Sequence, residues 1–190
     1  MERINLHSPG AVKDLLQRHG LAPNKQLGQN FLLDGGILSR IACASLGEEG
    51  EGGEGSGPKA VLEIGPGLGA LTQELAERAD RVLAVELDRG FIGVLEETLG
   101  PWATPEGDGR RLAVWETEEL AKASWPAGAK VCLVHGDFLK QDLHLLHGLL
   151  GGGPFSVCAN LPYYITTPII MRLLSSGLPI DLSLIHICTP

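Results

Sequence analysis

The chain has 190 residues, of which 44% are hydrophobic and 20% are charged, so it is long enough for one globular domain with its own core. It contains neither an apolar run of ~20 residues that could span a membrane nor an N-terminal signal-peptide pattern, and we therefore expect no membrane partner and a cytoplasmic location. The formal net charge of −8 argues against a nucleic-acid partner, which normally requires a basic patch.

The first 58 residues are predicted to form an N-terminal helical segment. Ser8 followed by Pro9 is typical of a helix start and predicts a helix running toward His19. Asp34 precedes a second predicted helix over Ile37–Leu46. Residues 47–57 are all Gly, Glu or Ser and have almost nothing to bury, so we interpret them as a flexible surface loop. The four glutamates of this loop need not face a substrate, which weakens the charge argument against nucleic acid.

From residue 59 onward, short apolar runs alternate with helical patterns. We expect strands over 59–64, 82–86, 131–134, 155–159 and 182–187, and helices over 71–78, 91–99, 116–123 and 167–174, the last capped by Thr167 and Pro168. This alternation predicts a mostly parallel sheet that is covered by helices on both faces, an α/β Rossmann-like fold over 59–190.

The ends of the first two predicted strands carry residues suited to a nucleoside cofactor. Parallel sheets of this kind bind ligands at the carboxyl ends of their strands. Gly65 and Gly67 follow the first strand and allow a tight turn with close approach of a ligand to the backbone. Glu86 ends the second strand, where it can accept hydrogen bonds from ribose hydroxyls. The pattern fits both NAD and S-adenosylmethionine, and a glycine turn without a ligand is the structural alternative.

The next two strand ends add an acid and a short motif. Asp137 can accept from an adenine amino group or, alternatively, cap the following helix. In Asn160-Leu161-Pro162-Tyr163, the Asn side-chain oxygen and a backbone carbonyl can accept the two N–H bonds of a nucleobase amine and so direct its lone pair at a methyl group. Pro162 stiffens this backbone, and Tyr163 can stack on a flipped base. A buried strand that ends in a proline turn is the other interpretation.

Together with these strand ends, the run from Lys25 to Leu32, KQLGQNFL, resembles the N-terminal signature of the KsgA-type ribosomal RNA adenine N6-dimethyltransferases, relatives of the Erm methylases. The resemblance spans residues 25–174. It implies that Asn30 and Leu32 line an S-adenosylmethionine site beside Gly65 and Gly67, and that Glu86 holds the ribose and Asp137 the adenine. By the same resemblance, Asn160 serves both the cofactor and the target amine, with Leu161, Pro162 and Tyr163 completing the catalytic segment.

The function implied by this resemblance is S-adenosylmethionine-dependent dimethylation of N6 on two adjacent adenosines of small-subunit rRNA, with rRNA or an immature small subunit as the partner of a monomeric enzyme. Leu161 favours this ribosome-maturation branch over Erm-type large-subunit methylases. A non-catalytic ribosome-assembly or transcription factor and an NAD-dependent oxidoreductase are the remaining alternatives. Scattered cysteines and histidines predict no metal site.

The family comparison also generates an expectation about length. A methyltransferase sheet of this type usually has seven strands, and we expect room for only five here, with the small C-terminal helical domain of the family missing. We therefore expect a fold truncated before its last strands, and a 190-residue chain that is poorly soluble and inactive on rRNA.

Overall fold

The computed structural model describes residues 3–21, 31–47, 59–103 and 112–188. Within these ranges the strands are β1 Ala60–Ile64, β2 Arg81–Glu86, β3 Ala113–Glu116, β4 Val131–His135, β5 Phe155–Pro162 and β6 Ile180–Cys188. The helices are α1 Pro9–Arg18, α2 Gly35–Ser45, α3 Ala70–Arg78, α4 Gly90–Leu99, α5 Leu143–Leu149 and α6 Tyr163–Leu174, with short 3-10 helices η2 Gly100–Trp102, η3 Thr117–Lys122 and η4 Phe138–Lys140.

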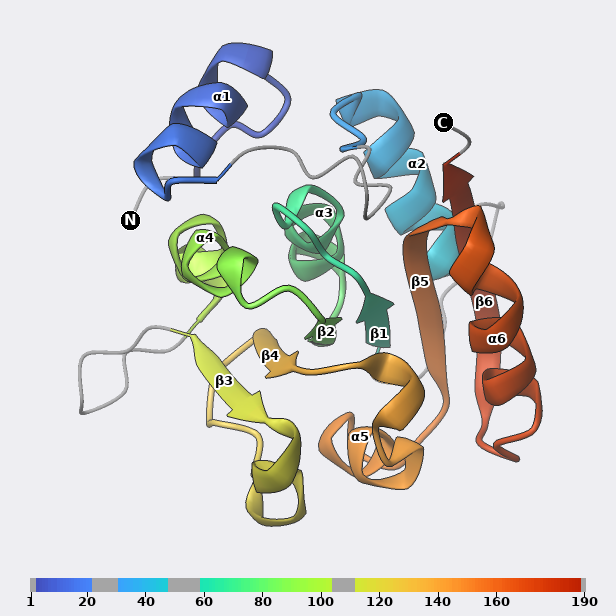
Figure 1. The fold of residues 1–190 in the computed structure, drawn as a ribbon. Helices are drawn as coiled ribbons and strands as arrows, with labels where there is room; N and C mark the ends of the chain where they lie inside the picture. The colour runs from blue at the N-terminus through green and yellow to red at the C-terminus, as the bar shows by residue number, and fades with distance from the viewer. Residues whose placement is uncertain (1–2, 22–30, 48–58, 104–111, 189–190) are drawn as a thin grey trace.

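The strands form one sheet in the order β3-β4-β2-β1-β5-β6, and every neighbouring pair is parallel. Helices α1 to α4 pack on one face, and α5 and α6 cover the other (Figure 1). The predicted α/β fold with a parallel sheet is therefore confirmed. In the part of the chain that the structure describes, no helix is both long and apolar enough to cross a membrane.

Two of the predicted helix starts have the expected caps. The Ser8 side chain accepts from the Ala11 amide, with Pro9 as the first residue of α1. The Asp34 carboxylate accepts from the Ile37 amide at 3.0 Å and begins α2. Both caps satisfy amide groups that have no partner within the helix.

Three predictions about the elements were wrong, and one element was missed. The sheet has six strands rather than five, because the four-residue edge strand β3, which is only half-buried, pairs with β4. Helix α5 was not predicted. The expected helix over 116–123 is the tighter 3-10 helix η3. Helix α6 begins at Tyr163, so Pro168 lies inside it and does not mark its start.

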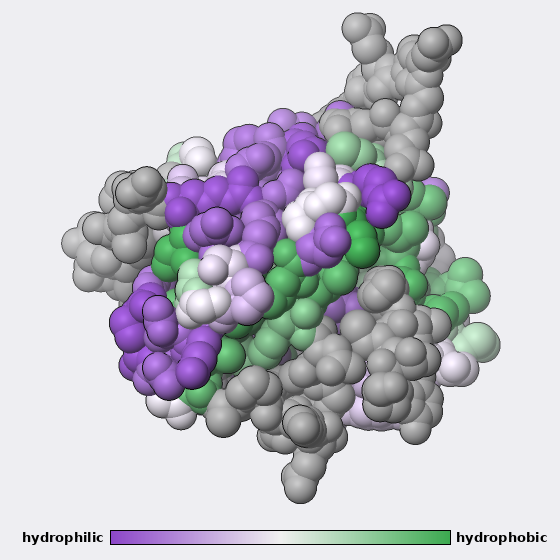
Figure 2. All heavy atoms as spheres, turned by 90° about the horizontal axis from the view of Figure 1, so that it is seen from above, coloured by the Kyte–Doolittle hydropathy of each residue, from purple (hydrophilic) through white to green (hydrophobic). Residues whose placement is uncertain are grey.

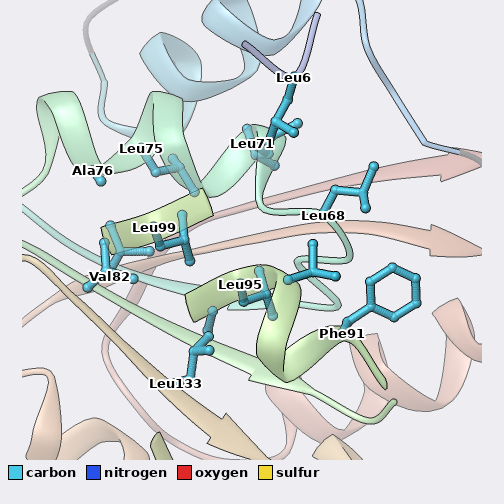
Figure 3. Close-up of a cluster of buried hydrophobic side chains, with 14 of the residues drawn as sticks. Leu6, Leu68, Leu71, Leu75, Ala76, Val82, Phe91, Leu95, Leu99 and Leu133 are labelled. Carbon is cyan, nitrogen blue, oxygen red and sulfur yellow. The ribbon is translucent and has the colours of Figure 1, made fainter. Parts of the chain in front are cut away.

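The larger apolar layer lies between the sheet and helices α3 and α4. Leu75 and Ala76 from α3 meet Leu95 and Leu99 from α4 (Figure 3). Strand side chains on the same face complete the layer, among them Val82 and Leu133. On the outside, the view onto the side of α1 and α2 shows much hydrophilic surface, crossed by a hydrophobic band (Figure 2). The buried layer fixes α3, and with it the turn that joins α3 to β1.

That turn contains three glycines with positive φ, Gly65 at 70°, Gly67 at 57° and Gly69 at 85°. Gly69 is the N-cap of α3, and a Cβ atom there would lie 3.1 Å from the Thr98 hydroxyl oxygen and 3.2 Å from two leucine side chains. The close packing of α3 on α4 therefore requires glycine at this position.

Replacing Gly69 by Ala should cost about 1–2 kcal/mol for the left-handed backbone and a further ~1–3 kcal/mol for the crowded Cβ. Gly152→Ala is the matched control, because Gly152 also has a positive φ of 74° but faces open space. Chemical denaturation should show the larger loss for Gly69→Ala, and equal losses would contradict the packing argument.

Candidate functional site

The pocket of interest lies at the carboxyl ends of the four central strands. These strands stand side by side in the order β4-β2-β1-β5, so the residues that follow them meet at one edge of the sheet. Most of the residues singled out from the sequence line this pocket: Leu32, Gly65, Gly67, Glu86, Asp137, Asn160, Leu161 and Pro162. Asn30 lies outside the described residues, as does the side chain of Tyr163.

Glu86 is held by the backbone around it. Its Oε2 atom accepts from the Gly67 amide at 3.1 Å and its Oε1 atom from the Asp88 amide at 2.8 Å. Burial raises the pKa of this carboxyl group, while the two amide donors act in the opposite direction. A carboxylate has about four lone-pair sites, so Glu86 can still accept hydrogen bonds from a ligand while it ties the glycine turn to the end of β2.

Asp137 caps the following helix, as one of the two interpretations of the sequence predicts, and it also lines the pocket. Its Oδ1 atom accepts from the Leu139 amide at 3.0 Å and caps η4. Its Oδ2 atom is 3.6 Å from the Nζ atom of Lys140, whose side chain is highly exposed. The cap fixes the carboxylate at the rim of the pocket with an oxygen left to accept from a ligand.

The Asn160-Leu161-Pro162 segment belongs to β5 itself. The strand continues through Pro162, with Asn160, Leu161 and Pro162 in register with the end of β6. Leu161 is buried, and a Cβ atom at Gly65 would lie 3.4 Å from its Cδ2 atom. The segment is therefore fixed in the sheet by its pairing with β6 and lies close to the glycine turn, and the interpretation as a buried strand holds alongside the pocket-lining position.

Two aromatic residues at the pocket were not singled out from the sequence. Tyr164 is 55% exposed and lines the pocket from the first turn of α6. Phe31 lines it as well and packs edge-on against Phe91, with ring centroids 5.9 Å apart. Phe31 lies inside the signature at 25–32, but an apolar residue there carries no chemical signal of its own.

A buried carboxyl group, Glu63, was also missed. Glu63 lies on β1, is 1% exposed and lines the pocket. Burial raises its pKa to about 8; the nearby Thr72 hydroxyl lowers the pKa and the Glu86 carboxyl raises it further. Thr72 is close enough for this effect, yet neither its hydroxyl nor Glu63 Oε2 has a hydrogen-bond partner among the described residues. The available signal was an acidic residue within an otherwise apolar strand.

The comparisons with known proteins agree with one another. A model of the family described as "Ribosomal RNA adenine dimethylase" matches residues 20–189. "Ribosomal RNA small subunit methyltransferase A" of Alkaliphilus oremlandii is 38% identical over 181 residues, covering 95% of this chain and 50% of the relative. The protein of the same name from Moorella thermoacetica is 45% identical over 175 residues, covering 89% and 49%. The chain thus spans about half the length of the curated relatives it matches.

Solved structures show the same fold. The crystal structure of the 23S rRNA methyltransferase ErmE is 28% identical, with a TM-score of 0.50 over 78% of this chain and 44% of that one. A Pyrococcus horikoshii protein solved as a candidate RNA methyltransferase is 19% identical, with a TM-score of 0.54 over 94% and 75%. The similarity to the Pyrococcus horikoshii protein is evidence for the fold alone.

The raised pKa of Glu63 predicts a pH-dependent stability difference. Between the ordinary carboxyl value of 4.5 and about 8, the folded protein keeps a proton that the unfolded chain releases, so stability falls as pH rises through this window. Glu63→Gln removes this effect, and its melting temperature should exceed that of the unchanged protein more at pH 8 than at pH 5. Thermal melts of the exposed-site control Glu118→Gln should follow the unchanged protein at both values. If the melting temperatures of Glu63→Gln and the unchanged protein differ by the same amount at both pH values, the raised pKa of Glu63 is contradicted.

Proposed function

Because the chain belongs to the ribosomal RNA adenine dimethylase family, we propose that it is an S-adenosylmethionine-dependent methyltransferase that dimethylates N6 of two adjacent adenosines in small-subunit rRNA. The observation that carries this proposal is the convergence of Gly65, Glu86, Asp137 and Asn160 on one pocket from four neighbouring strands. The curated relatives, named as small-subunit methyltransferases, favour this substrate over the large-subunit alternative.

The residues of the pocket fit the cofactor. The glycine turn presents bare backbone, and Glu86 combines two fixed backbone contacts with spare acceptor sites for the ribose hydroxyls. Asp137 offers an acceptor for the adenine amino group, and Leu32 lines the pocket from the N-terminal side. The family resemblance assigns the neighbouring Asn30 to the same cofactor site. When bound, S-adenosylmethionine supplies a methyl group already activated by a cationic sulfur. The protein therefore has mainly to bind and to orient.

The acceptor amine is held at the end of β5. The Asn160 side-chain oxygen and the Leu161 carbonyl accept its two N–H bonds, which directs the nitrogen lone pair toward the methyl group. Pairing of β5 with β1 extends to Ala159, and pairing with β6 continues through Pro162, so this segment is held on the β6 side. No strong base is needed, because the amine becomes acidic as it is alkylated and then releases its proton to solvent.

The target base must leave its stack to reach this pocket. Tyr163 is proposed to stack on it, and Tyr164 offers a second exposed ring at the mouth. Small-subunit rRNA, or an immature small subunit, is the proposed partner of the chain, which would act in the cytoplasm as a monomer and without a metal.

Changing Glu86 to Ala should weaken S-adenosylmethionine binding by tenfold or more, since charge-assisted hydrogen bonds are worth ~1.5–3 kcal/mol. Part of the loss arises because the Gly67 and Asp88 amides lose their acceptor. Calorimetric titration with S-adenosylmethionine, S-adenosylhomocysteine and NAD measures this effect and also tests the cofactor. Binding of NAD in place of S-adenosylmethionine would overturn the proposed function, and unchanged affinity of a folded Glu86→Ala variant would overturn the role of Glu86.

Asn160→Ala should reduce methyl transfer by about 10²–10³-fold, the effect of losing one group that stabilises the transition state, and should weaken cofactor binding less. Methyl incorporation into immature small subunits is the measurement, made on the chain joined to the part of the Moorella relative that it does not cover. Leu32→Ala, a change at the cofactor side of the pocket, is the contrasting variant and should act mainly on cofactor affinity. Near-normal turnover of Asn160→Ala would mean that the segment is structural.

A further inference from the structure

The rim of the pocket around Asp137 is supported from below by a fully buried side chain, that of Gln141. Gln141 directly follows the short helix η4 and is not among the described residues that line the pocket. Its side-chain nitrogen donates to the Asp137 carbonyl at 3.3 Å and to the Thr117 hydroxyl at 2.8 Å. Gln141 therefore joins the turn that carries Asp137 to the neighbouring helix η3.

The Gln141 side chain packs directly against the backbone at the end of β4. A Cβ atom at Gly136, the residue before Asp137, would lie 2.4 Å from the Gln141 side-chain nitrogen and 2.3 Å from the Thr117 hydroxyl oxygen. Both distances are far shorter than a van der Waals contact, so only glycine leaves room for these two side chains. The Gly136 amide also donates to the Glu86 carbonyl at 2.8 Å, which links this support to the strand that carries Glu86.

Helix η4 needs such support, because it is only three residues long and a 3-10 turn of this length has little stability of its own. Within the turn, the Lys140 amide donates to the Asp137 carbonyl at 2.9 Å and the Leu139 amide to the Asp137 carboxylate. From the opposite side, the Arg172 guanidinium of α6 donates to the Gln141 carbonyl. Gln141 is thus the residue through which η3 and α6 both hold the turn in place.

Packing alone does not explain an amide side chain at this position. The Oε1 atom of Gln141 is buried and has no hydrogen-bond partner among the described residues. A buried acceptor without a partner is costly, and an apolar side chain of similar size would avoid this cost. The amide therefore indicates a task for its two donor bonds, and one of them holds the main chain of Asp137.

Given that S-adenosylmethionine is the ligand of this pocket, as the proposed function holds, we propose that Gln141 is a positioning residue for recognition of the cofactor's adenine. Asp137 accepts from the 6-amino group, and Gln141 sets the place and direction of that carboxylate from outside the pocket. Hydrogen bonds weaken steeply when their geometry departs from the optimum. Selectivity for a purine with a 6-amino group therefore depends on a side chain that does not touch the cofactor.

The test compares S-adenosylhomocysteine with its analogue in which purine, without the 6-amino group, replaces adenine. Calorimetric titration of the 190-residue chain with each ligand gives a ratio of affinities that reports the contact of the amino group. The unchanged protein should favour S-adenosylhomocysteine by about tenfold or more, the effect of one hydrogen bond to a charged acceptor. Gln141→Met keeps the length of the side chain and removes both donor bonds, and it should lower this preference to about threefold or less, because a misaligned hydrogen bond retains only part of its strength.

Gln73→Met is the matched control. Gln73 is also buried, is not among the described residues that line the pocket, and donates from its side-chain nitrogen to the Ile4 and Thr98 carbonyls at 3.3 and 3.0 Å. Chemical denaturation should show a loss of stability for both variants, whereas only Gln141→Met should change the ratio of affinities. A role of Gln141 in stability alone would weaken both ligands equally and leave the ratio as it is.

The outcomes separate this inference from the proposed function. An unchanged ratio in Gln141→Met, an equal fall in Gln73→Met, or no preference for S-adenosylhomocysteine in the unchanged protein overturns the role of Gln141 and leaves the proposed function intact. Failure of the unchanged protein to bind S-adenosylhomocysteine and S-adenosylmethionine overturns both. If Gln141→Met does not fold, Thr117→Val decides, because it removes the hydroxyl that accepts from the Gln141 side chain. A lower ratio in Thr117→Val then supports the inference, and an unchanged ratio refutes it.

Discussion

The parallel pairing of the four central strands is the constraint on which the rest of this structure depends. Val85 is in register with both Ile64 and Val134, and Ile64 with Ala159, so the carboxyl ends of β1, β2, β4 and β5 lie at the same edge of the sheet, with β5 continuing to Pro162. The residues at or just after these ends therefore lie at one edge of the sheet, although Gly65 and Asn160 are 95 positions apart along the chain. Chemical groups that are far apart along the chain share a single pocket, because the backbone hydrogen bonds between parallel strands bring the ends of these strands to one edge.

Three carboxyl groups in this pocket illustrate how surroundings give identical chemistry different tasks. Glu86 accepts two amide hydrogen bonds and shapes the glycine turn, and Asp137 caps a short helix at the rim. Glu63 is buried, and its Oε2 atom has no hydrogen-bond partner among the described residues. Acidity near the ligand also changes the meaning of the net charge of −8, which at first argues against a nucleic-acid enzyme. Part of that charge lines the pocket and says little about the rest of the surface.

The sequence predicts the α/β class of this fold and the ends of its four central strands. Gly65, Glu86, Asp137 and Asn160 follow apolar runs, and the alternation of strands and helices suffices to bring them together. Strand β3 escapes prediction because its four half-buried residues form no apolar run, and its pairing depends on β4. Pro168 misplaces the start of α6, because proline near a threonine resembles a helix start while the neighbouring structure holds it inside the helix. Glu63 was not predicted as a site residue because its pKa is raised by burial, and only the packed structure reveals that burial.

The pairing of β1 with β5 has a consequence for how the molecule is made. Val61 pairs with Ser156, so β1 cannot pair with β5 until the residues between them have been synthesised. The strands β1, β2 and β4 can pair earlier, but closing a loop of this length is slow and costs chain entropy. A growing chain that has not yet docked β5 lacks the wall that carries Asn160 and Leu161. The pocket is therefore incomplete until β5 has paired with β1.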